Sequence, residues 1–321
     1  MYLIPIRVSI IGAGRTRNGI GEYIGKYFHK HGAIVTSVLG TSEKTSLQAS
    51  LALRKYGVEA HPYTDLDRMA EREKIDVAVI ASPSSTHQEY LLKCLDLGLH
   101  IFCEKPFIWN DYRGIRERIE DIFGKARRKK LTVAMNSQWP FSIDAYEAVS
   151  GKVVVENSNM FFMAMSPPFS GREMIPESVP HALSLLYSLL GVGEIEDLSF
   201  ESEGEQAMGI KFSYLFDTRS CDVSIRLTSG KTPPRDFSFG LNGKIVSRSL
   251  GPQNYEIYFH HGEMKMKIVD PLELSVKNFL EALETGTEPF IGYLHILHNT
   301  SLLRQIDDGF SEFAKNRSWK S

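Results

Sequence analysis

An acidic and a basic residue stand side by side where an apolar run ends. Residues 100–107 read HIFCEKPF, and the run closes on Glu104, Lys105 and Pro106. Placing charged groups at the end of a buried strand costs free energy unless each has a partner or a task. The pair can form a structural ion pair at the strand end, or it can hold a ligand and move a proton there.

A glycine-rich loop is the second candidate for chemistry. The segment VSIIGAGRTRNGIGEYIG places Gly12, Gly14, Gly19 and Gly21 between a first strand and the start of a helix. Glycine permits a tight turn and lets the backbone and the helix N-terminus approach a pyrophosphate. The loop is longer than the usual G-x-G-x-x-G spacing, so a turn without a ligand is the alternative. Arg15 can add a charge-assisted bond to phosphate, or it can be a solvated loop residue.

The end of the second strand lacks an acid. Sheets that bind NAD usually carry Asp or Glu there, to bind the adenine ribose. Here the strand continues as VLGTSEKTS, with Thr41, Ser42 and Lys44 near the expected position. Hydroxyls and a cation accept a 2′-phosphate that an acid would repel, so we expect NADP(H) to be preferred, with NAD(H) possible. Ser42 can also simply cap the following helix.

These residues need a scaffold, and the first part of the chain alternates in the manner of a doubly wound sheet. Short apolar strands rich in Val and Ile alternate with helical segments at 22–31, 43–56, 86–97 and 110–130. Continuous apolar strands separated by helices indicate a parallel sheet covered on both faces. We therefore predict a Rossmann-type, doubly wound α/β domain over residues 1–138.

The second part has a different pattern. Several strand-like segments, such as KVVVENSNMFFMAM, GIKFSYLF and CDVSIRLTS, follow one another through turns without intervening helices. This pattern favours an α+β domain with a mainly antiparallel open sheet over residues 139–321. Helical patterns at 179–190, 273–285 and 292–315 are candidates to cover one face. Because strands such as NMFFMAM carry more apolar residues than one covered face uses, we expect a homodimer through this C-terminal sheet.

Composition narrows the class of protein. The chain has 321 residues, a formal net charge of −2 and only three well-separated cysteines. This charge argues against a nucleic-acid partner and a polybasic membrane surface. No apolar stretch is long enough to span a bilayer, and the cysteines show neither metal-ligand spacing nor a disulfide framework. We expect a cytoplasmic protein with no metal site and a small-molecule substrate.

The segment IASPSSTHQEYLLKCLDLGLHIFCEKP resembles the glucose–fructose oxidoreductase/inositol dehydrogenase (Gfo/Idh/MocA) family. In that family a strand ends in a Thr-Pro or Ser-Pro turn, a His-containing helix follows, and then Glu-Lys-Pro. Ser82, Pro83 and His87 match this order, as do Glu104, Lys105 and Pro106. Ser84 stands where the family commonly has Asn. The resemblance covers about the first 140 residues and extends to the rest by architecture.

The resemblance assigns roles to the opening pair. It implies a cis peptide before Pro106, which turns the chain at a nicotinamide cofactor. It implies that Lys105 is catalytic, orienting the reacting oxygen and easing its proton movement, and that Glu104 satisfies nearby donors. It also implies that Ser82, Pro83, Ser84 and His87 belong to the cofactor site.

The family's catalytic histidine usually lies in an Asp-x-Gly-x-His-x-x-Asp pattern in the second domain. The counterpart here is REMIPESVPHALSLLYSLLG, in which His181 matches. Glu177 replaces the first Asp and Ser184 replaces the second. Because Pro180 is best tolerated at a helix start, we expect His181 in a first turn, where the helix dipole favours neutral imidazole. A structural histidine is the alternative.

The segment MNSQWPF resembles the family's Asn-x-Arg stretch, but Gln138 stands where Arg is common. Asn136 and Trp139 can line a substrate pocket, or they can pack between domains. Arg172 in PPFSGREM is a candidate anion contact or a solvated loop residue. With Glu177 and Ser184, these are the candidate substrate-binding residues.

The resulting prediction is an enzyme that transfers hydride between NADP(H) and a carbonyl or alcohol of a small, polar, sugar-like substrate. Two alternatives stay open. One is an imine or tetrapyrrole-type reductase on the same scaffold. The other is a regulatory protein that binds NADP(H) without turnover, which the missing Asp and Arg would suit.

Overall fold

The computed structural model describes residues 5–14, 19–109, 114–202, 204–230, 232–251 and 255–316, and the chain divides into two compact units. Unit 1 comprises residues 1–137 and 272–297, and unit 2 comprises residues 138–271 and 298–321. The predicted boundary after residue 138 thus lies one residue from the first division. Residues 272–297, which the sequence-based boundaries place in the second domain, cluster with unit 1.

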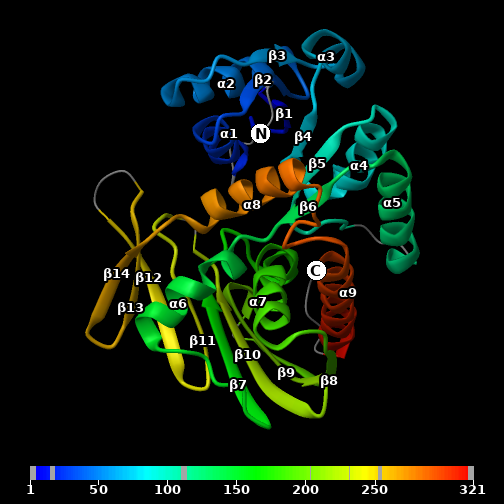
Figure 1. Cartoon of the computed structure of the whole chain (residues 1–321). Helices are drawn as coiled ribbons and strands as arrows, with labels where there is room; N and C mark the ends of the chain where they lie inside the picture. Colours follow the sequence, from blue (N-terminus) through cyan, green and yellow to red (C-terminus); the bar gives the residue numbers. More distant parts are fainter. Residues whose placement is uncertain are drawn as a thin grey trace. The chain divides into compact units, whose positions relative to one another are not determined.

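Unit 1 is built on a parallel sheet of six strands in the order β3-β2-β1-β4-β5-β6, the strand order of a Rossmann fold (Figure 1). The strands are β1 (Arg7–Ile11), β2 (Ile34–Leu39), β3 (His61–Tyr63), β4 (Val77–Ile80), β5 (His100–Glu104) and β6 (Val133–Asn136). The helices between them are α1 (Gly21–Lys30), α2 (Glu43–Leu53), α3 (Leu66–Glu73), α4 (His87–Asp96) and α5 (Ile115–Lys129). The predicted α/β fold is confirmed. The short β3 and α3 have too few apolar residues to stand out in the sequence.

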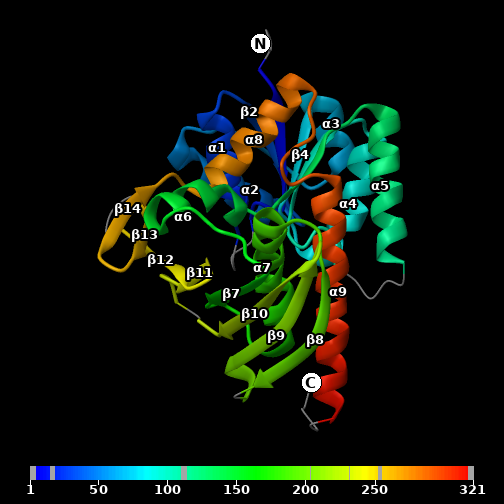
Figure 2. The same ribbon diagram turned by 60° about the horizontal axis from the view of Figure 1, so that its bottom comes forward.

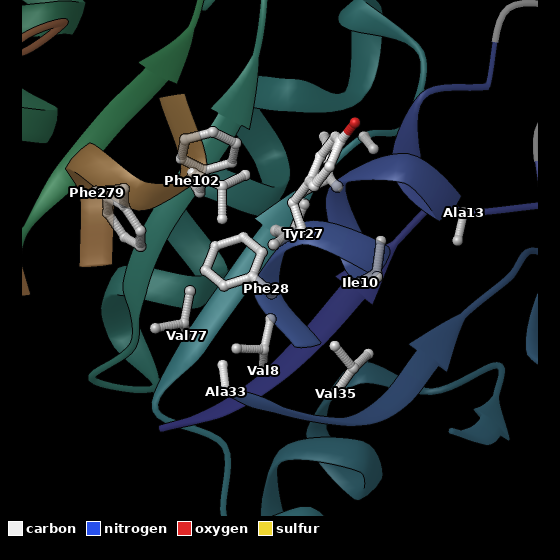
Figure 3. Packing of buried hydrophobic residues seen from close by; sticks show 14 of the residues in the cluster. Val8, Ile10, Ala13, Tyr27, Phe28, Ala33, Val35, Val77, Phe102 and Phe279 are labelled. Carbon is white, nitrogen blue, oxygen red and sulfur yellow. The ribbon is translucent and has the colours of Figure 1, made fainter. Parts of the chain in front are cut away.

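The core of unit 1 includes a helix from the C-terminal part of the chain. Phe279 of α8 (Pro271–Thr285) lies 5.2 Å from Phe102 of β5 and 6.1 Å from Phe28 of α1, between ring centroids (Figure 3). Val276 and Leu283 of α8 join the same buried cluster. The expectation that segment 273–285 covers the second sheet is therefore wrong, because its apolar face is buried against the first sheet.

Unit 2 contains a sheet of eight strands in the order β14-β13-β12-β11-β7-β10-β9-β8. All neighbours are antiparallel except β7 and β10, so the predicted mainly antiparallel sheet is confirmed. The strands are β7 (Ser158–Met165), β8 (Glu194–Ser202), β9 (Ala207–Phe216), β10 (Arg219–Thr228), β11 (Phe237–Leu241), β12 (Lys244–Leu250), β13 (Ile257–His261) and β14 (Met264–Ile268).

Helices cover one face of this sheet. The helix α6 (Ile143–Ser150) packs on β12, β13 and β14, and α7 (Met174–Leu190) packs on β7 and β10 (Figure 2). Phe310 of α9 (Tyr293–Asn316) contacts Phe200 of β8. Every second residue of β9 from Met208 to Phe216 is buried. The apolar residues of GIKFSYLF therefore mostly serve the covered face, and Met160 of β7, 63% exposed, is the clearest apolar residue outside it.

Candidate active site

Loops from four neighbouring strands of unit 1 meet at one edge of its sheet, because parallel strands all present their carboxyl ends there. The Gly12 N–H donates to the Leu39 carbonyl at 2.9 Å, and the Ala81 N–H donates to the Ile11 carbonyl at 2.9 Å. The Gly12 backbone has φ +85°. A Cβ at Gly12 would lie 2.6 Å from the Ser82 Cα, so only glycine lets the loops after β1 and β4 approach this closely.

The start of α1 fits the diphosphate of a dinucleotide. Among the described side chains, none caps the N-terminus of α1, which begins at Gly21. A helix start without a side-chain cap is where a phosphate group can bind. Gly14 packs on α2, since a Cβ there would lie 2.7 Å from the Thr45 carbonyl oxygen. Gly19 precedes α1, and Arg15 lies outside the described residues.

The start of α2 is capped by its own side chains. The Ser42 Oγ accepts from the Thr45 N–H at 3.3 Å, and the Thr45 Oγ1 accepts from the Ser42 N–H at 3.1 Å. The capping role considered for Ser42 is confirmed. Thr41, Ser42 and Lys44 are all exposed after β2. Their contact with an adenine ribose or its 2′-phosphate stays a prediction.

His87 ties the loop after β4 to the loop after β5. Its Nε2 lies 2.9 Å from the Ser82 carbonyl oxygen, and its Nδ1 lies 2.9 Å from the Pro106 carbonyl oxygen. Because His87 is 1% exposed, it positions the two loops from beneath. A direct contact between its ring and a cofactor, as the cofactor-site prediction implies, is disfavoured by this burial. Pro83 and Ser84 begin the turn that leads into α4.

Glu104 and Lys105, at the end of β5, lie among residues that fix their positions. Glu104 is 7% exposed, and its carboxylate accepts from the Asn136 amide at the end of β6. This bond supplies the donor that the resemblance implied for Glu104. The Lys105–Pro106 peptide is cis, as the resemblance also implied. Lys105 is half-buried between Glu104, which Asn136 holds, and Pro106, which His87 holds.

In unit 2, His181 lies in the middle of α7 and is 7% exposed. The expectation of a first-turn position is wrong, because α7 begins at Met174 and contains Pro180 in its interior. A dipole effect at the helix start therefore does not act on this imidazole. The His181 ring meets Trp139 edge to face at 6.5 Å between centroids. The sequence-predicted pocket residue and the predicted catalytic residue of unit 2 are thus neighbours.

Comparison with known proteins agrees with this geometry. The model of the Gfo/Idh/MocA family, described as "Oxidoreductase family, NAD-binding Rossmann fold", matches residues 6–137. This segment carries all the motifs gathered at the sheet edge. Residues 6–137 belong to the Gfo/Idh/MocA family.

Relatives and solved structures extend the comparison. The chain is 27% identical over 143 residues to D-glucoside 3-dehydrogenase of Escherichia coli, covering 44% of this chain and 38% of the relative. It is 32% identical over 132 residues to inositol 2-dehydrogenase of Klebsiella pneumoniae, covering 40% and 36%. The chain therefore matches little more than a third of these relatives' lengths. None of the helices in the described part of the chain has the length and hydropathy needed to cross a bilayer.

The fold resemblance covers both units. A 3-ketoreductase from Actinomadura kijaniata, solved in complex with NADP, has a TM-score of 0.68 and 17% identity. The alignment covers 95% of this chain and 98% of that one. At this identity the likeness establishes the fold alone.

Two of the predicted substrate-binding residues of unit 2, Ser184 and Arg172, bond to other residues of the chain. Ser184 is fully buried, and its hydroxyl accepts from the Asn299 amide at 2.8 Å. The Arg172 Nε and Nη2 donate to the two carboxylate oxygens of Asp307, at 2.7 and 2.5 Å. These bonds disfavour substrate contacts for Ser184 and Arg172. Glu177 is half-buried one turn before His181, so both residues lie on one face of α7.

Sequence reasoning missed Arg248 on β12. Its guanidinium carbon lies 5.6 Å from the Trp139 ring and 6.0 Å from the Phe237 ring. In the segment KIVSRSL, Arg248 occupies the same alternating face as Val246, which is fully buried. A charged residue two positions from a buried apolar residue on the same strand is the sequence pattern that could have revealed Arg248.

Proposed function

We propose that the chain is an NADP(H)-dependent oxidoreductase that reduces a carbonyl, or oxidises an alcohol, of a small, polar, sugar-like substrate. The observation that carries this proposal is the setting of Lys105 at the carboxyl edge of the family-matched sheet. Its neighbours Glu104 and Pro106 are each held by a buried side chain, Asn136 and His87 respectively. Such support around one ammonium group is typical of a residue that must be held in a fixed position.

The two proposed catalytic residues belong to different units. Bound NADP(H) would supply or accept the hydride. In carbonyl reduction, Lys105 would donate a hydrogen bond to the reacting oxygen and His181 would deliver the proton; in alcohol oxidation, His181 would accept it. The positions of Gly12, Gly14, Gly19 and Gly21, with the uncapped start of α1, support binding of the diphosphate.

The proposed preference for NADP(H) depends on the end of β2. Thr41, Ser42 and Lys44 are exposed there, and Gly40 stands directly after the strand. A Cβ at Gly40 would lie 2.6 Å from the Ser46 nitrogen, so this position leaves no room for an acidic side chain. The complex of the Actinomadura kijaniata 3-ketoreductase with NADP is consistent with such a site on this fold.

A second candidate function is NADP(H)-dependent regulation without turnover. Two internal bonds favour it. Ser184 bonds to Asn299 and Arg172 bonds to Asp307, so neither side chain is left for a substrate. In this case the chain would bind the cofactor through unit 1, and unit 2 would respond to it.

A turnover screen separates these candidates. NADPH consumption is followed across aldehydes, ketones and imines, and NADP+ reduction across sugars and polyols, with the Lys105→Met variant as the blank. Turnover of a sugar-like carbonyl or alcohol by the wild type alone supports the proposed function. Turnover confined to imines favours the imine reductase alternative. NADPH binding without turnover on any class favours the regulatory candidate.

We also propose that the protein forms a homodimer through the open face of the unit 2 sheet. A shallow hollow on this face is lined by apolar and charged residues, among them Met160, Phe162, Ile245, Lys211, Asp222 and Arg226. Light scattering should give twice the chain mass of 36.3 kDa at micromolar concentration. Met160→Glu should lower that mass, whereas a wild-type monomer would contradict the proposal.

We propose that the protein is located in the cytoplasm, which is a reducing compartment. Cys94, Cys103 and Cys221 are free and buried. Burial raises the pKa of Cys94 and of Cys221 to about 12, so neither thiol is deprotonated near neutral pH. Thiol titration of protein extracted from its native cells under rapid alkylation should find all three reduced.

A further inference from the structure

Arg248 belongs to an aromatic cluster on the covered face of the unit 2 sheet. The rings of Trp139 and Phe237 are stacked, with centroids 3.8 Å apart and planes at 19°. The Arg248 guanidinium lies close to both rings. His181 meets the same Trp139 ring from α7. One tryptophan therefore lies beside both a cation and the proposed catalytic imidazole.

The next feature of the cluster is the charge of Arg248. Within the described ranges, no carboxylate forms an ion pair with it, and its one hydrogen bond runs from a terminal nitrogen to the Arg235 carbonyl. Burial lowers the pKa of Arg248, and this effect outweighs the opposite effect of Tyr255, Asp270 and Asp236. An aromatic face attracts a guanidinium but does not neutralise it.

Two hydrogen-bond donors in this cluster lack acceptors. The Arg248 Nε is buried and has no hydrogen-bond partner among the described residues, and the same holds for the Trp139 Nε1. Trp139 is 2% exposed. Leaving a buried donor unpaired costs about 1–3 kcal/mol, and more when the donor is charged. Two such donors on stacked side chains point to an acceptor that carries negative charge and that both can reach.

We propose that Arg248, with Trp139, binds an anionic group of the substrate, a carboxylate or a phosphate. The inference rests on the proposed function in so far as this ligand is the molecule that His181 acts on. The substrate class is then an acidic or phosphorylated sugar rather than a neutral polyol.

Binding of matched probes to the full-length protein tests this inference without requiring turnover. D-glucuronate tests the carboxylate, α-D-glucose 1-phosphate tests the phosphate, and D-glucose is the neutral reference, each titrated by calorimetry. Arg248→Met keeps much of the side-chain volume over Trp139 and removes the charge. Arg219→Met is the matched control, because Arg219 also lies over a phenyl ring, that of Phe216, at 4.9 Å, in the same unit.

We expect Arg248→Met to weaken binding of one anionic probe about ten- to hundredfold, as loss of a charged hydrogen bond implies, and to leave D-glucose binding unchanged. Arg219→Met should bind all probes like the wild type. The favoured probe identifies the anion as carboxylate or phosphate. Because removal of an uncompensated buried charge relieves the fold, the Tm of Arg248→Met should stay level or rise.

Wild-type protein that binds neither anionic probe would overturn the inference, as would binding by Arg248→Met within twofold of the wild type. Arg248→Lys keeps the charge without the planar fork and should retain part of the affinity, which provides a second test if Arg248→Met is poorly folded. Turnover distinguishes the two proposals. Arg248-dependent anion binding without any sugar turnover would refute only the oxidoreductase function, and equal turnover of an acidic or phosphorylated sugar by wild type and Arg248→Met would refute only the anion site.

Discussion

The two units differ in how closely they keep the Gfo/Idh/MocA pattern. In unit 1 the loops after β1, β4 and β5 carry the expected motifs. His87 bonds to both the loop after β4 and the loop after β5, and Asn136 bonds to Glu104. In unit 2 only His181 keeps its place, while Ser184 and Arg172 bond inside the chain. The half of the molecule that would bind a common cofactor is therefore maintained, and the half that would meet the substrate is altered.

This difference follows from what each unit must recognise. A dinucleotide diphosphate makes the same demands on a glycine loop and a helix start in each such sheet, so this loop has little freedom to vary. Substrates differ in charge and size, and their recognition depends on a few polar side chains. Arg248, beside Trp139 in unit 2, is a side chain of this kind.

The largest expected effect lies on catalysis and involves both units. Lys105→Met and His181→Ala should each lower kcat about a hundred- to ten-thousand-fold on the true substrate, because each removes a group that handles the proton. Steady-state kinetics with saturating NADPH measures this. Ser184→Ala is the control, since its hydroxyl bonds to Asn299 and not to the reacting oxygen. Wild-type turnover by both Lys105→Met and His181→Ala would remove the catalytic assignment.

The next effect belongs to unit 1 alone. Gly12→Ala should weaken NADPH binding at least about tenfold and lower the Tm, because its Cβ would meet the Ser82 backbone at 2.6 Å. Gly32→Ala is a matched control, since Gly32 has a similar φ of +87° with nothing within 4 Å of an added Cβ. Its cost should be the backbone strain alone, about 1–2 kcal/mol. Equal losses in both variants would show that the contact between the two loops does not matter.

A smaller effect sharpens the cofactor choice within unit 1. Thr41→Asp should shift the ratio of NADPH to NADH affinity toward NADH by about tenfold, because a carboxylate near the ribose repels a 2′-phosphate. Fluorescence titration with both nucleotides gives the ratio, and Thr41→Asn serves as the neutral control. If the ratio is unchanged, the ribose site lies elsewhere; if wild-type protein binds NADH at least as tightly as NADPH, the preference for NADP(H) is wrong.

The smallest expected effect is a loss of stability at acidic pH, and it involves one histidine in each unit. Burial lowers the pKa of His100 in unit 1 and of His298 in unit 2. The His100 ring accepts the Thr132 N–H, so its protonation breaks that bond. The His298 Nε2 lies near both the N–H and the carbonyl oxygen of Gly193, and burial is what disfavours its protonated form. Because the folded-state pKa lies below the unfolded value of about 6.5, this stability is complete above that pH and is lost as the pH falls below it.

Hydrogen exchange at pH 7.5 and pH 5 reads this effect in each unit separately. His298→Gln should make unit 2 less sensitive to acid and leave unit 1 unchanged, and His100→Gln should do the reverse. An acid response that neither variant alters would assign it to other groups.

Much of unit 1 could be predicted from the sequence, because its signals are local. Strand, glycine loop and X-Pro turn each occupy a short segment, and parallel strands bring their carboxyl ends to one edge. The role of α8 could not be predicted, because its apolar face fits either sheet and only packing of Phe279 on Phe102 decides between them. The same holds for the Asn299 bond to Ser184, which joins residues 115 positions apart. The start of α7 was misplaced because Pro180 in a helix interior contradicts the usual preference of proline.

The measurement that tests this division of roles most directly is the NADPH dissociation constant of four proteins: wild type, Gly12→Ala, His181→Ala and Arg248→Met. We predict that Gly12→Ala alone binds NADPH more weakly, by at least about tenfold, and that the two unit 2 variants stay within about twofold of the wild type. Weakening of NADPH binding by His181→Ala or Arg248→Met as large as that by Gly12→Ala would contradict the account.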